Sequence, residues 1–300
     1  MKSAAEAFNS SDLADKSWLA VLADLVKARL TALVLLTTFV GFYLGWQGPM
    51  NYPLMFHALF GTALVAAGAA ALNQLLEREF DARMRRTASR PLPSGRLQPG
   101  TVTLLGGTWS AAGLIYLALL VNPLTSVLAA VTLVSYLFIY TPLKRITWIN
   151  TLVGAIPGAL PPLMGWTAAR NELSGEGWTL FAILACWQIP HFMAIAWLYR
   201  GEYERAGFKM LPMIDPDGRR TGEQSIRYTV ALFMVSLCPY LLKLDGPVYL
   251  ALALVLGLGY FWTAVRFAQQ LTDRRARQLF LASIIYLPLL LTAMVLDKLK

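Results

Sequence analysis

The chain has 300 residues, of which 57% are apolar and only 14% charged, and its mean hydropathy is +0.53. Soluble domains contain roughly 45–50% apolar and about 25% charged residues, and their interiors stop growing near about 250–300 residues, so this composition excludes a soluble fold. It also excludes a disordered chain, a collagen-like repeat and a disulfide scaffold. The formal net charge of +9 would suggest nucleic acid in a soluble protein, but the charge bias of membrane proteins explains it better, and we expect no nucleic acid partner.

The N-terminus, Met1 to Trp18, is polar and mixed in charge. It lacks the basic start, short apolar core and small-residue cleavage site of a signal peptide. We therefore expect residues 1–28 to form a cytoplasmic N-terminal segment, followed by a single transmembrane domain over residues 29–300.

Nine apolar stretches follow, each long enough to cross a hydrocarbon core about 30 Å thick as a helix. We expect an all-α bundle of about nine transmembrane helices. Only Asn122-Pro123 separates the third stretch from the fourth, which indicates a tight helical hairpin, and three prolines between 157 and 162 predict a kink or local unwinding in the fifth. The stretches lie near 29–46, 53–75, 101–121, 124–141, 149–167, 178–199, 228–243, 247–266 and 279–297.

The basic residues lie mainly on one side of these stretches. Alternate connections, beginning with the N-terminal segment, hold 22 of the 26 lysines and arginines. The positive-inside rule then predicts a multi-pass protein of the cell inner membrane, with a cytoplasmic N-terminus and an outside C-terminus. Two long connections on the basic side, 76–100 and 200–227, collect carboxylates as well as arginines. Because long polar loops commonly carry function, we expect a polar site at the cytoplasmic face.

The second stretch continues into a polar helix end with the sequence NQLLEREFD, residues 73–81. Residues four apart on a helix are offset by about 40° and about 6 Å, so Asn73, Glu77 and Asp81 form one ridge while Glu79 points elsewhere. Hard oxygen ligands in a row suit Mg²⁺, which prefers carboxylates together with substrate phosphate. The alternative is a solvated helix end whose acids pair with nearby arginines. Asn73 favours the functional interpretation, because an amide at lipid depth needs a partner.

Charged residues also end two other stretches and fill the loop after the ridge. The loop MRRTASRPLPSG (84–95) contains two prolines and a glycine, which rule out a continuing helix, and its arginines could pair with phosphate through their planar donor forks. The sequences YTPLKR (140–145) and YRGEYERAGFK (199–209) add cations and carboxylates. His191 lies inside the sixth stretch, where an imidazole could ligate haem iron or simply bond a neighbouring helix.

These motifs together resemble a known family. The ridge and the RTASRPLPSG loop resemble the first acidic motif of the UbiA-type intramembrane prenyltransferases. The loop, YTPLKR, WQIPHF (187–192) and the stretch 199–212 resemble, more narrowly, the protohaem IX farnesyltransferase subfamily. The resemblance extends from about residue 25 to the C-terminus. The second acidic motif departs from the family, since Gly201 and Glu202 stand where acids, often Asp, are usual.

The resemblance implies an enzyme that transfers the farnesyl group of farnesyl diphosphate to a vinyl group of haem b and adds water, giving haem O. It implies Mg²⁺ as cofactor, haem b as a substrate, the lipid bilayer as surroundings, and a downstream haem-modifying enzyme or terminal oxidase assembly as a candidate partner. It assigns the catalytic, diphosphate-binding and haem-binding residues as follows. The metal and diphosphate ridge is Asn73, Glu77 and Asp81, with Glu202 as a second acid; the diphosphate-neutralising groups are Arg86, Arg90, Lys144, Arg145, Arg200 and Lys209; and the haem contact is His191.

Three other functions fit parts of the pattern. Another UbiA-type prenyltransferase would use a different acceptor. A membrane transporter would also contain broken helices and intramembrane polar residues, but it should show internal repeats and polar groups near the bilayer midplane. A haem-binding assembly factor without catalysis would need histidines but no acidic ridge, and only His191 is well placed.

Overall fold

The computed structural model describes residues 17–299. Most of the expected N-terminal segment, residues 1–16, therefore lies outside the described residues. Within the described range the regular structure is helical, apart from one isolated β-bridge between Asp245 and Lys298. The all-α prediction is confirmed.

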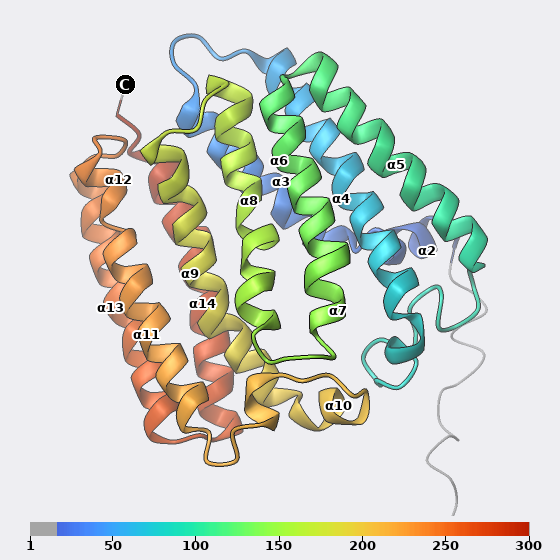
Figure 1. Ribbon diagram of the computed structural model, residues 1–300. Helices are drawn as coiled ribbons and strands as arrows, with labels where there is room; N and C mark the ends of the chain where they lie inside the picture. The colour runs from blue at the N-terminus through green and yellow to red at the C-terminus, as the bar shows by residue number, and fades with distance from the viewer. Residues whose placement is uncertain (1–16, 300) are drawn as a thin grey trace, which may run out of the picture.

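The helices follow the apolar stretches in chain order (Figure 1). The elements are α2 (Trp18–Leu25), α3 (Ala28–Gly45), α4 (Tyr52–Asp81), α5 (Pro99–Leu120), α6 (Pro123–Val134), the π-helical η1 (Ser135–Tyr140), α7 (Thr141–Leu143), α8 (Asn150–Arg170), α9 (Gly175–Leu198), α10 (Arg200–Arg205), the 3₁₀ turn η2 (Leu211–Met213), α11 (Arg219–Val235), α12 (Cys238–Leu241), α13 (Pro247–Gln269) and α14 (Asp273–Leu296).

Eight membrane spans are long and apolar enough to cross a bilayer within the described part of the chain. The seventh expected span differs, because α11 begins at Arg219 rather than near 228 and a break at Ser236-Leu237 separates it from α12. The last span also begins earlier than expected, at Asp273 instead of 279. The connection before it shrinks to residues 270–272, so the arginines expected in a loop lie on helices.

Local sequence signals explain the hairpin, and for the proline-rich helix they left a kink or local unwinding as alternatives. Asn122 caps α6 by accepting a hydrogen bond from the Thr125 backbone N–H at 2.8 Å, and Pro123 takes the first helical position, where its missing N–H costs nothing. The expected tight turn is confirmed. Helix α8 continues without interruption through Pro157, Pro161 and Pro162. Local unwinding is therefore the wrong alternative, and packing against neighbouring helices on several sides maintains α8.

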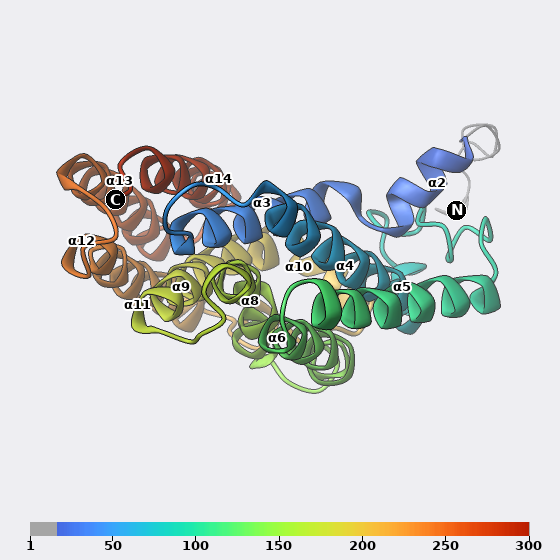
Figure 2. The same cartoon turned by 90° about the horizontal axis from the view of Figure 1, so that it is seen from above.

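The central helices are α8 and α9. Within the 18-residue apolar segment of each span, the buried share is 67% in α8 and 61% in α9, whereas it is 28–44% in the other six spans. Seen from above in Figure 2, α4, α5 and α6 lie on one side of this pair and α11 and α13 on the other. Glycines let α3 approach α8 closely: a Cβ on Gly41 would lie 1.9 Å from the Pro162 carbonyl oxygen, and one on Gly165 equally close to that of Thr38.

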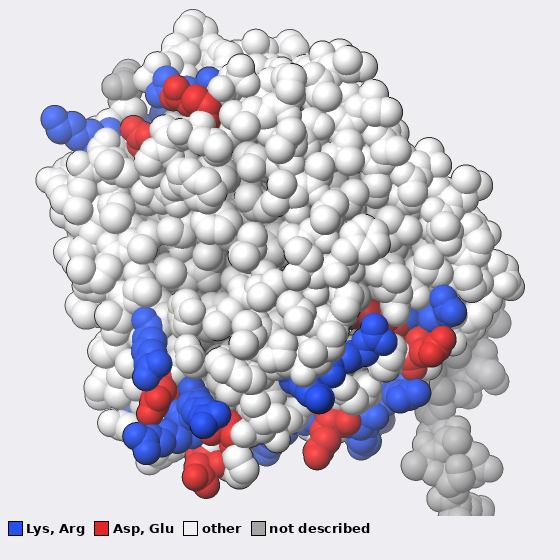
Figure 3. Space-filling model, viewed as in Figure 1, with Lys and Arg blue, Asp and Glu red and all other residues white. Residues whose placement is uncertain are grey.

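Charged side chains are concentrated at the two ends of the bundle, and more of them lie at one end than at the other (Figure 3). In Figure 3 lysines, arginines and carboxylates gather along the lower edge, over α10 and the start of α11, and a broad uncharged band separates them from a smaller group at the opposite edge. We call the lower edge the charged end. It holds the ends of α4, α7 and α9, with the loop 82–98 and α10 beside them (Figure 1), and it positions the site described next.

Candidate functional site

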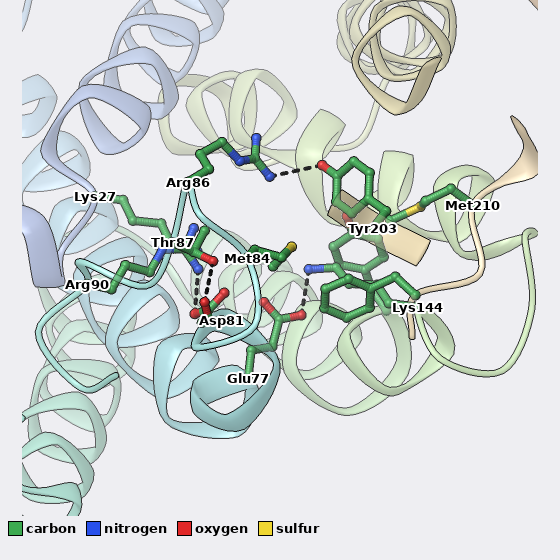
Figure 4. A pocket seen from close by; sticks show the side chains of 12 residues that line it. Lys27, Glu77, Asp81, Met84, Arg86, Thr87, Arg90, Lys144, Tyr203 and Met210 are labelled. Atoms are coloured by element: carbon green, nitrogen blue, oxygen red, sulfur yellow. Dashed lines mark hydrogen bonds and ion pairs between the residues drawn. The ribbon is translucent and has the colours of Figure 1, made fainter. Parts of the chain in front are cut away.

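A cavity opens at the charged end between the end of α4, the loop 82–98, α7 and the segment after α9 (Figure 4). It has about 400 Å³ of empty space, open solvent included. Helix ends from three distant parts of the chain therefore meet here, as the sequence predicts. The residues that line it are Lys27, Glu77, Asp81, Met84, Arg86, Thr87, Arg90, Tyr140, Lys144, Tyr203, Phe208 and Met210.

The polar ridge forms on α4. Asn73, Glu77 and Asp81 lie at successive turns of this helix and are 0%, 6% and 1% exposed, so each is removed from bulk water. The side chain of Glu79 is 70% exposed and lies outside the cavity lining. The expected separation of the ridge from Glu79 is confirmed, and it follows from helical periodicity alone.

Both ridge carboxylates are held by cations from other elements. Lys144, at the end of α7, donates to Glu77 Oε1 at 2.7 Å, and Arg90, in the loop, donates to Asp81 Oδ2 at 2.6 Å. Thr87 donates its hydroxyl to the Asp81 backbone carbonyl at 2.8 Å, which fixes the loop over the end of α4 (Figure 4). The acids are thus paired, as the solvated-helix alternative requires, but the pairs are buried and face a cavity rather than open water.

Lys27 is a lining residue that sequence reasoning missed. It lies between α2 and α3 with a left-handed backbone, φ 49°, and its ammonium donates to Asn73 Oδ1 at 2.7 Å. Gln74 fixes this turn, because its amide donates to the carbonyls of Asp24 and Leu25 at the end of α2. A strained backbone around a buried charge is typical of a functional position. The only sequence signal was a lysine directly before the first span, which the positive-inside rule had already explained.

The two lysines of the cavity differ in electrostatics. Burial, assisted by the positive charge of Arg90, lowers the pKa of Lys27 to about 7. Burial also disfavours the ammonium of Lys144, but attraction from Glu77 and the nearby tyrosines outweighs it and raises the pKa of Lys144. Glu77 therefore favours the charged form of Lys144, whereas an anion in the cavity would favour the charged form of Lys27.

The ridge fits a divalent cation. Asp81 Oδ1 is buried and has no hydrogen-bond partner within the described residues, so one carboxylate oxygen at the cavity remains free for a ligand. No group of three or more His, Cys, Asp or Glu side chains is close enough to hold a metal in that part of the chain. Mg²⁺ commonly binds through one or two carboxylates plus substrate phosphate and water, so Glu77 and Asp81 could hold it once a phosphate is present.

Arg86 forms the wall between this cavity and a second one. Its guanidinium lies 5.1 Å from the ring centre of Tyr199 and 5.6 Å from that of Tyr203, and it donates to the Tyr203 hydroxyl at 3.0 Å. The second cavity has about 490 Å³ of empty space, open solvent included, and shares Arg86, Tyr140, Tyr203 and Met210 with the first, so the two lie side by side. Its remaining lining comes from α8 and α9 and is more apolar: Asn150, Thr151, Phe192, Ile195 and Ala196.

Six of the expected site residues line neither cavity: Asn73, which bonds the lining residue Lys27, His191, which is described below, and four charged residues. Arg145 is exposed over the Phe80 ring, and Arg200 pairs with Asp273 at 2.8 Å. Lys209 is exposed and contributes backbone atoms, its N–H donating to the Lys144 carbonyl at 2.7 Å. Glu202 accepts a long hydrogen bond, 3.4 Å, from the Arg86 backbone N–H. Glu202 thus supports the loop that carries Arg86, and these four do not line the cavity with Arg86, Arg90 and Lys144.

His191 also lies apart from the cavities. Its ring stacks between Trp187 and Phe280, with centroid distances of 4.9 and 5.1 Å, and its Nδ1 lies 2.7 Å from the Ser283 hydroxyl. The Ser283 hydroxyl also bonds the Phe280 carbonyl at 2.5 Å. If the hydroxyl donates to that carbonyl, then Nδ1–H donates to the hydroxyl and Nε2 keeps its lone pair. The expected hydrogen bond to a neighbouring helix is therefore made by Nδ1, to Ser283 on α14. Phe192, the next residue, lines the second cavity.

Comparisons with known proteins agree with this architecture. Residues 34–287 match the UbiA prenyltransferase family. A protein of Solibacter usitatus (strain Ellin6076), named protoheme IX farnesyltransferase, is 48% identical over 284 residues, which cover 92% of this chain and 97% of that protein.

Two solved structures share the fold. The structure of a digeranylgeranylglyceryl phosphate synthase superposes with a TM-score of 0.80 at 16% identity, over 93% of this chain and 98% of that one. A UbiA homolog from Archaeoglobus fulgidus, bound to GPP and Mg²⁺, superposes with a TM-score of 0.67 at 15% identity, over 92% and 99%.

Proposed function

The chain belongs to the UbiA prenyltransferase family, and we propose that it transfers the farnesyl group of farnesyl diphosphate to a vinyl group of haem b, with addition of water, to give haem O and diphosphate. Similarity to the protoheme IX farnesyltransferase of Solibacter usitatus, 48% over almost the whole length of both chains, supports the acceptor. The observation that carries the proposal is the cavity, where a buried acidic ridge is surrounded by Lys27, Arg86, Arg90 and Lys144.

The cations bind and stabilise the leaving group. The bond between the allylic carbon and the diphosphate oxygen breaks, and its electron pair leaves with diphosphate. Negative charge therefore develops on that oxygen, and fixed cations aimed at it lower the barrier. Lys144 and Arg90 are already oriented by their ion pairs. Lys27 lies beside Arg90 on one side of the cavity, Lys144 lies on the other side, and Arg86 extends above them in Figure 4.

The second cavity shields the reactive carbon. The allylic cation adds to the terminal carbon of the vinyl group, the adjacent carbon then takes the oxygen of water, and one proton is released, so atoms and charge balance. Such a cation requires a water-poor pocket until the acceptor reacts. The lining by Phe192, Ile195 and Ala196 supplies one directly beside Arg86.

A divalent cation completes the acidic ridge. The UbiA homolog of Archaeoglobus fulgidus is bound to GPP and Mg²⁺, and in this chain Glu77 and Asp81 would hold Mg²⁺, with Asn73 beside them. When bound, the metal supplies Lewis-acid stabilisation of the diphosphate. Asn73 Oδ1 is bonded to Lys27, so its part in the ridge includes orienting that lysine.

His191 is the proposed haem contact. It lies one residue before Phe192 on α9, and its Nε2 is the ring atom that could ligand an iron if Nδ1–H is held by Ser283. We expect His191→Gln to change the haem absorption spectrum of the purified protein and to leave farnesyl diphosphate binding unchanged.

Membrane placement follows from the same proposal. The charged end faces the cytoplasm of the cell inner membrane because most lysines and arginines lie there, and residues 29–300 form one prenyltransferase domain. Farnesyl diphosphate is reached from that face, while haem b and the farnesyl tail partition into the bilayer. A downstream haem-modifying enzyme or oxidase assembly would receive the product.

The test uses detergent-purified protein with haem b, farnesyl diphosphate and Mg²⁺, with and without a chelator, and mass spectrometry of the porphyrin. We expect a farnesyl-plus-water adduct that the chelator abolishes. Diphosphate release without the adduct would instead support a prenyltransferase with another acceptor. No adduct and no diphosphate release from folded protein would contradict the proposal.

A matched variant tests the ridge. Asp81→Asn keeps the size of the side chain but removes its charge, so it should abolish transfer while the protein remains folded. An Asp81→Asn protein with near-normal turnover would remove Asp81 from the site. Glu79→Gln, on the exposed face of the same helix turn, is the control and should keep parent activity.

A further inference from the structure

Arginines gather at the charged end on the turn that joins α13 to α14, outside both cavities. Arg266 lies in the last turn of α13, and Arg274 and Arg275 lie in the first turn of α14. Only residues 270–272 separate the two helices, and Arg266 and Arg274 are close enough to Arg275 to repel it. We call Arg266, Arg274 and Arg275 the arginine cluster.

The cluster has no acidic partner among residues 17–299. Arg275 donates only to the neutral amides of Gln270 at 3.3 Å and Gln278 at 2.8 Å. The neighbouring carboxylate, Asp273, is bonded to Arg200. Three guanidiniums thus lie together with uncompensated charge, and two of them occupy a helix N-terminus, where the helix dipole disfavours cations. Such an arrangement is expected where an anion is bound.

Exposed apolar residues place the cluster at the depth of lipid headgroups. Trp262, one turn before Arg266, is 58% exposed, and the Arg266 guanidinium lies 5.7 Å from its ring centre. Leu258 and Leu281, farther into the spans, are 57% and 50% exposed. Tryptophan is enriched where the bilayer interior meets water, and basic pockets between membrane helices bind anionic headgroups.

We propose that the arginine cluster binds the phosphate of an anionic phospholipid in the leaflet at the charged end. Guanidiniums suit phosphate because their donor forks match its oxygens, and Gln270 and Gln278 hold Arg275 in place for that contact. A lipid is favoured over an acidic protein because the same ligand then covers Trp262 and the exposed leucines with its acyl chains. This inference is independent of the proposed enzymatic function.

The experiment measures lipid binding to the detergent-solubilised protein by native mass spectrometry. Phosphatidylglycerol, cardiolipin and phosphatidylcholine are titrated separately, against the parent and a triple variant, Arg266→Gln/Arg274→Gln/Arg275→Gln. Each arginine near an anionic surface contributes roughly fivefold in affinity, so the triple variant should bind the anionic lipids roughly 100-fold more weakly. Phosphatidylcholine should bind equally to both.

The control variant is Arg219→Gln/Arg220→Gln/Arg227→Gln, which removes the same charge from the first half of α11, a helix that begins at the same end. It should retain anionic lipid binding. Equal losses in both variants would show that net charge alone attracts the lipid, and they would overturn the proposal, as would no loss in either. Loss of binding to polyglutamate but not to phosphatidylglycerol would identify an acidic protein partner instead. If the triple variant does not fold, Arg275→Gln alone should weaken phosphatidylglycerol binding roughly fivefold, and no weakening would overturn the site.

Discussion

The buried ion pair between Lys144 and Glu77 permits a quantitative test of the cavity. The two charged atoms lie 2.7 Å apart, and the side chains are only 13% and 8% exposed. Lys144→Met removes one partner and leaves the Glu77 carboxylate buried, a change that costs about 3–5 kcal/mol in folded proteins. Lys27 also attracts Glu77, so we expect the lower end, about 3 kcal/mol of unfolding free energy.

The double variant separates stability from function. Glu77→Gln/Lys144→Met removes both charges, so its unfolding free energy should return to within about 1 kcal/mol of the parent. The assay is unfolding in mixed detergent micelles of the parent, both single variants and the double variant, without substrate. Transfer activity should be absent from the double variant, because Lys144 no longer neutralises the charge of the diphosphate. The reasoning would be refuted if the double variant were as unstable as Lys144→Met alone. It would also be refuted if the unfolding free energy of Lys144→Met lay within about 0.5 kcal/mol of the parent's.

Two further predictions concern packing and pH. Gly41→Ala places a methyl 1.9 Å from the Pro162 carbonyl oxygen and should lower the unfolding free energy by about 3 kcal/mol. The control Gly107→Ala, whose methyl would have nothing within 4 Å, should leave the melting temperature unchanged. Equal melting temperatures of the two variants would contradict the close approach of α3 and α8. Burial and the charge of Asp297 raise the pKa of Asp245 to about 7. The contribution of the protonated Asp245 carboxyl to the unfolding free energy is therefore complete below about pH 4 and disappears as pH rises through 7. Asp245→Asn should therefore stabilise the protein by about 4 kcal/mol at pH 8 and not at pH 4, and a difference independent of pH would contradict this.

The ridge was predictable from sequence because helical periodicity is local. Once the helix through residues 73–81 is recognised, Asn73, Glu77 and Asp81 must share a face and Glu79 cannot join them. The same reasoning could not find Lys27, which donates to Asn73 Oδ1. Lys27 lies 46 residues away, and only the packing of α2 against α4 brings the two together.

Adjacent cations show a second limit of sequence reasoning. Lys144 and Arg145 are neighbours with the same charge, and the sequence treats them alike. The chain turns after α7, so Lys144 reaches Glu77 while Arg145 lies over Phe80. Side-chain direction in an irregular turn depends on tertiary contacts rather than on residue type. Likewise, the position of the α13–α14 turn could not be read from hydropathy, because charged residues continue the helix.

The charge of the cavity explains what its occupant must supply. Its lining contains four basic side chains, Lys27, Arg86, Arg90 and Lys144, but only two carboxylates. Excess positive charge away from water is costly unless an anion balances it, and the lowered pKa of Lys27 is one consequence of that cost. Under the proposed function, a bound diphosphate would supply the missing negative charge, so most of the substrate affinity should arise in this cavity. Discrimination among prenyl groups and acceptors, which differ in apolar shape, would then occur beyond Arg86 in the second cavity.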